Sequence, residues 1–166
     1  MPPSDVVEYA KLADSLGYHS VWISEGNGGD QFSILTACAM ATKNVQLGTS
    51  VSSVFVRSAP TIAMAAACVD YFSSGRLLLG LGSSHKVQVE GQHGMVYSNP
   101  LSRTLEAVEI IRTLIKTGWV SYKGQHLNID NFDLSFPTYR TEIPIYLAAV
   151  FPKMLQACGQ VAEGTI

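Results

Sequence analysis

Apolar residues follow two different patterns along the chain, and each pattern predicts a different kind of element. Segments with apolar residues three and four positions apart predict helices over residues 4–17, 31–42, 60–73, 100–115 and 152–164. Short continuous apolar runs predict buried strands over residues 20–24, 45–54, 76–82 and 143–150. Because helices and strands alternate, and the strands are apolar at successive positions, the pattern is typical of an α/β fold with a parallel sheet covered by helices.

Residues at the helix ends support these boundaries. Ser4 and Asp30 are expected to cap the first two helices, because a short polar side chain can accept a hydrogen bond from a free N–H group of the first turn. Gly17 is expected to end the first helix. Asn99 and Pro100 form a cap and first-turn pair for the helix that follows them.

Residues 119–142 interrupt the alternation of helices and strands. Apolar and polar residues alternate here around turn signals, which predicts a small β-hairpin inserted between a helix and a strand. A long ordered excursion of this kind in a compact domain is often functional. Two interpretations therefore stay open, a flap near an active site and an insertion without a role in chemistry.

Composition narrows the class of protein. The 166 residues are 47% hydrophobic and 14% charged, which is enough to bury one sizeable core. The formal net charge of −2, with basic and acidic residues interleaved, argues against a nucleic-acid or membrane partner. The longest apolar run, residues 62–69, is too short to cross a bilayer. The three cysteines lie far apart and no secretory signal is visible, so we expect reduced thiols and a cytoplasmic protein.

The segment "SSGRLLLGLGSSH" (73–85) raises the question of a phosphate-binding loop. Gly80 and Gly82 could begin a G-x-G-x-x-G motif of a dinucleotide-binding fold. The sixth position is His85 instead of glycine, and no helical pattern follows at once. The motif alone is therefore weak evidence for nucleotide binding.

Four segments together resemble the luciferase-like monooxygenase superfamily: "LADSLGYHSVWISEGNGGDQF", "VQLGTSVSSVFVRSAP", "DYFSSGRLLLGLGSSH" and "IPIYLAAVFPKMLQACGQVAEGTI". Within it, the chain is most similar to reductases that depend on the deazaflavin coenzyme F420, such as methylenetetrahydromethanopterin reductase. The resemblance implies a (β/α)8 barrel, for which about 250 residues is typical. Residues 1–166 would then form a single incomplete domain that holds about strands 2 to 5 and the start of strand 6.

The resemblance also implies an activity. The expected function is an oxidoreductase that moves a hydride between coenzyme F420 and a small organic substrate, whose identity the sequence does not give. An alternative on the same fold is a monooxygenase that depends on FMN. An alternative of another class is a non-catalytic or truncated cofactor-binding barrel remnant. The isolated 166 residues are expected to be inactive, and the full-length protein could form a homodimer.

In this family the carboxyl end of the strand at 76–82 lies against the cofactor. The resemblance places Gly82, Ser83, Ser84 and His85 in a wall beside a flat ring system, since glycine at positions 80 and 82 leaves room for a close approach. The alternative is that the glycines only pack within the barrel interior.

The neighbouring strand carries a second cofactor segment. By resemblance, "GTSVSS" holds a bulge with a non-prolyl cis peptide between Ser50 and Val51, and Thr49 and Ser50 present polar groups to the edge of the ring. The alternative is an ordinary strand with a serine-rich end.

The strand end "SEGNGGDQF" provides the candidate catalytic residues, Glu25 and Asn27. Glu25 matches an acidic position of the family and is expected to orient the substrate or relay a proton. Many relatives have histidine at the next position, where this chain has Gly26. The sequence therefore does not identify the residue that would donate a proton.

The remaining candidates lie near the fourth predicted strand and in the segment after residue 85. Val150 and Phe151 precede a helix N-terminus, where relatives bind the cofactor phosphate. Lys153 is either a further phosphate contact or a solvated lysine. No metal site is expected, because His85, Glu90 and His93 have no further ligand at metal-like spacing.

Overall fold

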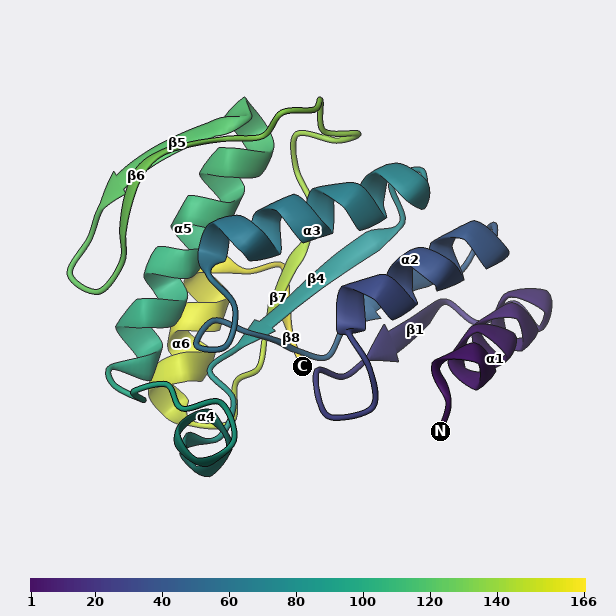
Figure 1. The fold of residues 1–166 in the computed structure, drawn as a ribbon, viewed down its shortest axis with the longest axis horizontal. Helices are drawn as coiled ribbons and strands as arrows, with labels where there is room; N and C mark the ends of the chain where they lie inside the picture. Colours follow the sequence, from purple (N-terminus) through teal and green to yellow (C-terminus); the bar gives the residue numbers. More distant parts are fainter.

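The computed structural model describes residues 1–166, and its helices and strands alternate along most of the chain (Figure 1). The helices are α1 (Pro3–Ser15), α2 (Gln31–Ala41), α3 (Ala59–Phe72), α4 (Lys86–Gly91), α5 (Pro100–Thr117) and α6 (Pro152–Val161). The main strands are β1 (Ser20–Ile23), β2 (Gln46–Thr49), β3 (Ser52–Ser53), β4 (Leu77–Gly82), β7 (Ile145–Leu147) and β8 (Gly164–Thr165). A separate hairpin consists of β5 (Trp119–Lys123) and β6 (Asn128–Asp133).

The main sheet is parallel, as the continuous apolar runs predicted. Its strands follow the order β1-β2-β4-β7-β8, and β3 pairs with the carboxyl end of β4. Every pair in this sheet is parallel. The strand predicted over residues 45–54 is divided into β2 and β3, and the peptide bond between Ser50 and Val51 in the gap is cis, as the resemblance implied.

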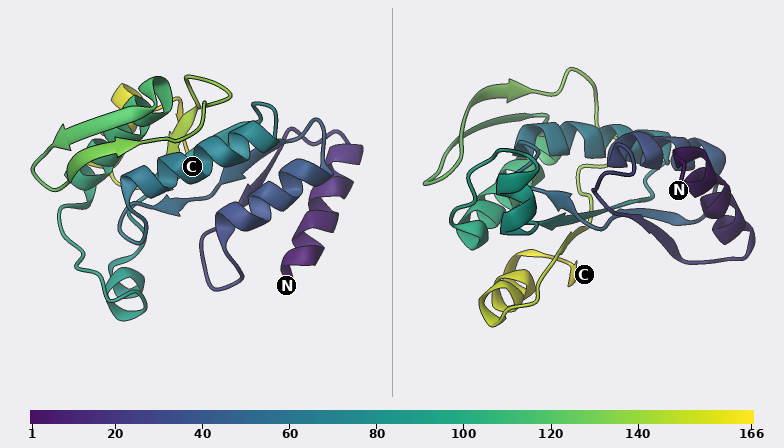
Figure 2. Two further views of the ribbon diagram at one scale, coloured as in Figure 1. Left: turned by 45° about the horizontal axis from the view of Figure 1, so that its top comes forward. Right: turned by 60° about the horizontal axis from the view of Figure 1, so that its bottom comes forward.

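The helices pack against one another in chain order outside the sheet. α1 contacts α2, α2 contacts α3, α3 contacts α5, and α5 contacts α6. Figure 2 shows α2 and α3 side by side along the same side of the sheet. None of the helices combines the length and the apolar character needed to cross a membrane.

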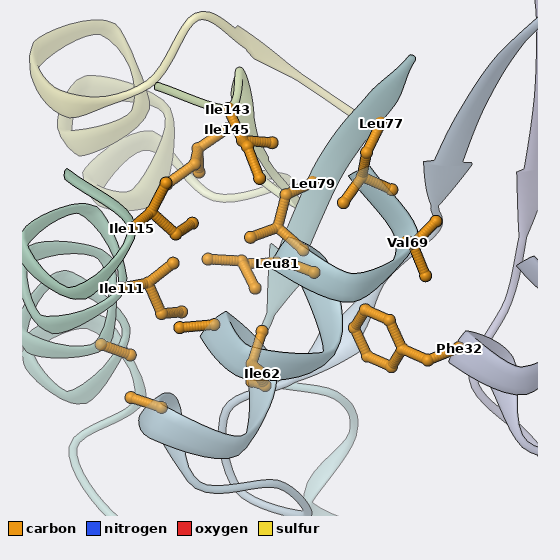
Figure 3. Packing of buried hydrophobic residues seen from close by; sticks show 14 of the residues in the cluster. Phe32, Ile62, Val69, Leu77, Leu79, Leu81, Ile111, Ile115, Ile143 and Ile145 are labelled. Carbon is orange, nitrogen blue, oxygen red and sulfur yellow. The ribbon is translucent and has the colours of Figure 1, made fainter. Parts of the chain in front are cut away.

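The main hydrophobic core lies between β4 and the helices α3 and α5. Leu79 and Leu81 of β4 are fully buried and belong to the same cluster as Ile62 of α3 and Ile111 of α5 (Figure 3). Burying a side chain of this size stabilises the fold by about 1.5–3 kcal/mol. On the opposite face of β4, Leu78 is also buried, which explains why this strand is apolar at successive positions.

Three predicted helix ends differ from the structure. The helix predicted over residues 152–164 ends at Val161, and Gly164 belongs to β8. α1 begins at Pro3, so Ser4 lies inside the first turn and does not cap the helix. Asn99 occupies the N-cap position of α5 in a left-handed conformation, and its side chain makes no capping hydrogen bond. Asp30 does cap α2, because its carboxylate accepts a hydrogen bond from the backbone N–H of Ser33 at 2.9 Å.

The short helix α4 was not predicted from the sequence. Its six residues include one buried side chain, Val89, so the segment is too short to show a helical period. α4 lies directly after the end of β4 and contributes to the cleft described below.

Asp70 and Arg76 each connect a helix to the sheet, and they do not pair with each other. Asp70 of α3 accepts a hydrogen bond from Leu77 N and pairs with Arg140. The guanidinium of Arg76 donates to backbone carbonyl groups at the end of α2 and just before β2, including Val45 O at 2.8 Å.

Candidate active site

A polar cleft of about 430 Å³ lies at the carboxyl ends of β1, β3 and β4. Glu25 and Asn27 follow β1, Ser53 belongs to β3, and Ser84 follows β4. α4 and the residues after it close another side of the cleft and contribute Gln88, Gln92 and His93. In barrels of parallel strands and helices, active sites lie at this end of the sheet. The structure therefore brings Glu25, Asn27 and Ser84 together, as the sequence predicted.

A larger cavity of about 760 Å³ lies elsewhere, between α5, α6 and the hairpin. Three glutamates line it, but each carboxylate bonds to protein: Glu106 to hairpin amides, Glu109 to the Tyr122 hydroxyl and Glu163 to Arg112. The cavity lies among α5, α6 and the hairpin, away from the carboxyl ends of the strands. None of the residues that line the smaller, polar cleft comes from the hairpin, so the structure gives no support to the flap interpretation.

The segment around the cis peptide is fixed by backbone hydrogen bonds to both neighbouring strands. Ser50 N donates to Ile23 O at 2.8 Å, and Val54 N donates to Gly82 O at 3.0 Å. Ser50 and Val51 are half-buried, so they face the partly open end of the sheet.

Thr49 does not offer its hydroxyl group to a ring edge, which corrects the expectation from the sequence. The side chain is fully buried. Its hydroxyl group donates to Gly80 O and accepts from Gly80 N, both at 2.7 Å. The only hydroxyl proton is therefore used within the protein, and Thr49 joins two strands.

The glycines of β4 are required by neighbouring protein atoms. A Cβ on Gly80 would lie 1.9 Å from Thr49 O, and a Cβ on Gly82 would lie 2.6 Å from Val51 Cγ2 and 3.1 Å from Ala148 Cβ. Packing within the barrel, the alternative that the sequence left open, accounts for Gly80. Gly82 lets the side chain of Val51 lie close to the end of β4.

Ser83 and Ser84 are held at the rim of the site by a tyrosine that the sequence did not indicate. The Tyr97 hydroxyl donates to Ser83 Oγ at 3.1 Å and lies 3.4 Å from Ser84 O. The Tyr97 ring stacks on Phe55, with 4.6 Å between the ring centroids. Ser84 has a left-handed backbone with φ of 57°, and the next residue, His85, is exposed.

Glu25 is engaged by protein groups on both carboxylate oxygens. One oxygen pairs with Arg57 Nε, and the other accepts a hydrogen bond from Ser53 N at 2.8 Å. Arg57 also donates through Nη2 to Asp30 at 2.6 Å. Burial by itself would lower the pKa of Arg57, but the hydrogen bonds to Glu25 and Asp30 raise that pKa above its ordinary value.

The contact with Arg57 also affects the pKa of Asp30. Burial alone would raise the pKa of Asp30, but the Ser33 amide and the Arg57 guanidinium hold it below its usual value. Asp30 is therefore a charged helix cap that also pairs with Arg57. Arg57 could have been noticed in the sequence as the only basic residue between Lys43 and Arg76, directly after the serine-rich strand.

The structure does not bring Val150 and Phe151 into the polar cleft. Their side chains are 80% and 76% exposed, and they precede α6. Phe151 holds the N-cap position and makes no side-chain capping hydrogen bond. Lys153 is exposed in the first turn of α6. No group of three His, Cys, Asp or Glu side chains in residues 1–166 is arranged to hold a metal ion.

Comparison with known proteins shows which family the sequence of this chain matches. A family model described as luciferase-like monooxygenase matches residues 1–166. A 5,10-methylenetetrahydromethanopterin reductase of Archaeoglobus fulgidus is 35% identical, and the match covers 95% of this chain and 47% of the relative. An F420-dependent glucose-6-phosphate dehydrogenase of Amycolatopsis mediterranei is 30% identical, with 99% of this chain and 53% of the relative covered.

A solved structure has the same fold as this chain. The structure of a coenzyme F420 dependent tetrahydromethanopterin reductase from Methanopyrus kandleri superposes with a TM-score of 0.92 at 24% identity, covering 99% of this chain and 52% of that one. The parallel sheet and its helices are thus part of a (β/α)8 barrel. The chain spans about half the length of the relatives it matches.

Proposed function

Because the chain belongs to the luciferase-like monooxygenase family, we propose that the full-length protein is an oxidoreductase that transfers a hydride between coenzyme F420 and a small organic substrate. The observation that carries this proposal is the match along the whole chain to relatives named as methylenetetrahydromethanopterin reductase and as an F420-dependent dehydrogenase. The half-buried polar end of the parallel sheet supports it.

The residues at this end of the sheet fit such a cofactor by their chemistry. Ser50, Ser83 and Ser84 place half-buried hydroxyl groups on two neighbouring strand ends, where they can bond to a polar ring edge or a ribityl chain. The first turn of α6 has no side-chain cap, and since Pro152 has no N–H group and Met154 N and Leu155 N donate to Phe151 O, the Lys153 N–H is the group left for a phosphate beside Val150 and Phe151.

Each part of the site has a distinct role in the proposed reaction. The bound cofactor supplies the hydride chemistry, and the protein supplies orientation and electrostatics. Val51 and Gly82 would shape the wall beside the ring, and the serines would orient it. Asn27 lines the cleft and is exposed, so it would contact the substrate, and the exposed His85, directly after Ser84, would contact the outer part of the cofactor.

A monooxygenase that uses FMN is the second candidate. The description of the matching family names monooxygenases, which favours this candidate over an unrelated oxidoreductase. It ranks below F420 because the four relatives at 30% identity or more carry names of reductases or of F420-dependent oxidoreductases and dehydrogenases. A non-catalytic or truncated barrel remnant that binds the cofactor without turnover is the candidate of another class.

Parallel titrations separate these three functions. The full-length protein is titrated with oxidised F420 and, separately, with FMN, and binding is followed by the change in cofactor fluorescence. We expect saturable binding of F420 at least about tenfold tighter than that of FMN, equivalent to about 1.4 kcal/mol. Tighter binding of FMN would favour the monooxygenase, and binding of F420 without turnover in an activity assay would favour the remnant. Binding of neither cofactor would contradict the proposed function.

A further inference from the structure

Two loops at the polar cleft are joined by one guanidinium group. The first loop, residues 24–30, follows β1, and the second, residues 54–58, follows β3. Arg57 of the second loop pairs with both Glu25 and Asp30 of the first. Its guanidinium carbon also lies 5.2 Å from the centre of the Phe32 ring, on the helix that Asp30 caps. Arg57 is therefore in contact with both ends of the first loop.

The contact extends from Glu25 to the wall of the cleft. Glu25 accepts a hydrogen bond from Ser53 N at 2.8 Å, and its second contact, to Ser52 Oγ, is 3.5 Å long. Both serines are fully buried. Without Glu25 the buried N–H group of Ser53 would lose its acceptor, and a buried donor without a partner is strongly unfavourable. Glu25 thus fixes the backbone that directly follows the cis peptide.

The charge and the exposure of Arg57 and Glu25 fit a role in supporting the wall of the cleft. The side chains of Arg57 and Glu25 are 23% and 15% exposed, so their pairing is shielded from much of the solvent. The cluster holds two carboxylates and one guanidinium, and both carboxylates point to that one cation. Each oxygen of Glu25 already accepts a hydrogen bond from a protein donor, as expected of a carboxylate that holds neighbouring segments in place.

We propose that Arg57 is a positioning residue that holds Glu25 as a fixed acceptor for the Ser53 amide, and that this pair keeps residues 50–53 in place as a wall of the cofactor site. Glu25 then supports the site and does not transfer a proton. The inference rests on the proposed function for its link to the cofactor, but the contacts themselves do not depend on that function.

The first test needs no cofactor. Backbone amide exchange in residues 49–56 is compared between the full-length wild type, Arg57→Gln and Arg57→Lys. We expect Arg57→Gln to exchange about tenfold faster or more, which is the effect of losing one hydrogen bond to a charged group. Arg57→Lys keeps the charge but lacks the fork that reaches two carboxylates, so partial rescue is expected. The matched control is Arg112→Gln, which removes an arginine from an exposed pair with Glu163 away from the cleft.

The second test uses the cofactor. We expect Arg57→Gln to weaken F420 binding about tenfold or more, with partial recovery in Arg57→Lys and no change in Arg112→Gln. Glu25→Gln keeps an oxygen acceptor for Ser53 but cannot transfer a proton. It is expected to lower the hydride-transfer rate while leaving the shape of the pH profile unchanged.

The outcomes are distinct. Wild-type exchange in residues 49–56 of Arg57→Gln would overturn the positioning role, and loss of one limb of the pH profile in Glu25→Gln would overturn the assignment of Glu25. If Arg57→Gln does not fold, the same exchange comparison in Arg57→Lys and Asp30→Asn decides, because each keeps part of the contact. If the wild type does not bind F420, the proposed function fails, and the exchange comparison still tests the positioning role.

Discussion

Thr49 joins β2 to β4 through its side chain at the point where the backbone pairing of these strands ends. The register of β2 with β4 pairs Leu47 with Leu77 and Gly48 with Leu78. One residue further, the Thr49 hydroxyl group takes both hydrogen bonds of Gly80. The Thr49 side chain thus takes the place of the backbone hydrogen bonds between β2 and β4, directly before the cis peptide.

This junction gives a prediction at the scale of one residue. Thr49→Val keeps the shape of the side chain but leaves the buried N–H of Gly80 without its acceptor, so we expect a loss of about 1–3 kcal/mol in the free energy of unfolding. Thr49→Ser keeps the hydroxyl group and is expected to lose less. Denaturant unfolding of the full-length protein measures both variants, and equal stability of the two would contradict the role of the hydroxyl group.

Residue types and residue contacts differ in how well the sequence indicates them. The sequence placed Glu25, Asn27 and Ser84 at one end of the sheet, because strand ends can be read from the apolar runs. It did not indicate the partners of these residues. Thr49 and Gly80 are separated by 31 positions and Glu25 and Arg57 by 32, so only the folded chain brings them together.

At the scale of elements, Arg140 connects the segment after the hairpin to the core. Its guanidinium pairs with Asp70, which is 1% exposed, and also donates to Leu77 O at 2.9 Å. Removing one partner of such a pair leaves a buried charge without compensation.

We therefore expect Arg140→Leu to lower the free energy of unfolding by about 3 kcal/mol. Arg112→Leu is a matched control, because Arg112 and Glu163 are both more than 40% exposed and such pairs contribute about 0–1 kcal/mol. Thermal or denaturant unfolding of the full-length protein compares the two variants. An effect of Arg140→Leu no larger than that of the control would show that Asp70 does not need this partner.

The hairpin is anchored to α5 by a carboxylate that is sensitive to acid. Glu106 accepts hydrogen bonds from the amides of Gln125, His126 and Leu127 at the hairpin turn. Burial alone would raise the pKa of Glu106, but these amides bring it below its ordinary value of 4.5. The anchoring is thus complete above pH 4.5 and is lost as the pH falls below 4.5 through the lower pKa of the folded state.

Amide exchange at residues 125–127 is expected to accelerate in that acidic range beyond the intrinsic effect of pH. Glu106→Gln cannot change its charge, so its exchange at the turn is expected to show no such additional change. The same acid response in both proteins would assign it to another group.

The bounds of some helices and strands were predicted more accurately than those of others, for physical reasons. The long helix α5 and the fully apolar strand β4 lie close to their predicted bounds, because both carry many periodic or continuous apolar positions. The strand predicted over residues 143–150 is only three residues long as β7, since apolar residues continue beyond its hydrogen-bonded part. The helix α4 has too few residues to display a period.

At the scale of the whole molecule, the sheet has two open edges, β1 and β8. On the face opposite the main core, Trp22 and Tyr146 contact each other edge to face with centroids 5.6 Å apart, and Ile166 is 42% exposed. A closed barrel has no such edges, because its first and last strands pair.

Residues 1–166 produced alone are accordingly expected to aggregate or to associate through these edges, and to lack turnover. Size measurement and thermal unfolding of this segment test the expectation. A monomer that unfolds cooperatively and binds F420 tightly would contradict it.

The central claim is that the full-length protein binds F420 at the carboxyl end of this sheet. The most direct measurement is the F420 dissociation constant of Ser83→Leu beside that of Ser121→Leu, which places the same side chain on the exposed face of β5. A leucine at position 83 would put an apolar group where, in the proposed site, the Ser83 hydroxyl group would meet the ring or its chain. The account predicts binding weakened about tenfold or more in Ser83→Leu, equivalent to at least about 1.4 kcal/mol, and unchanged binding in Ser121→Leu. Wild-type affinity in a folded Ser83→Leu variant would contradict it.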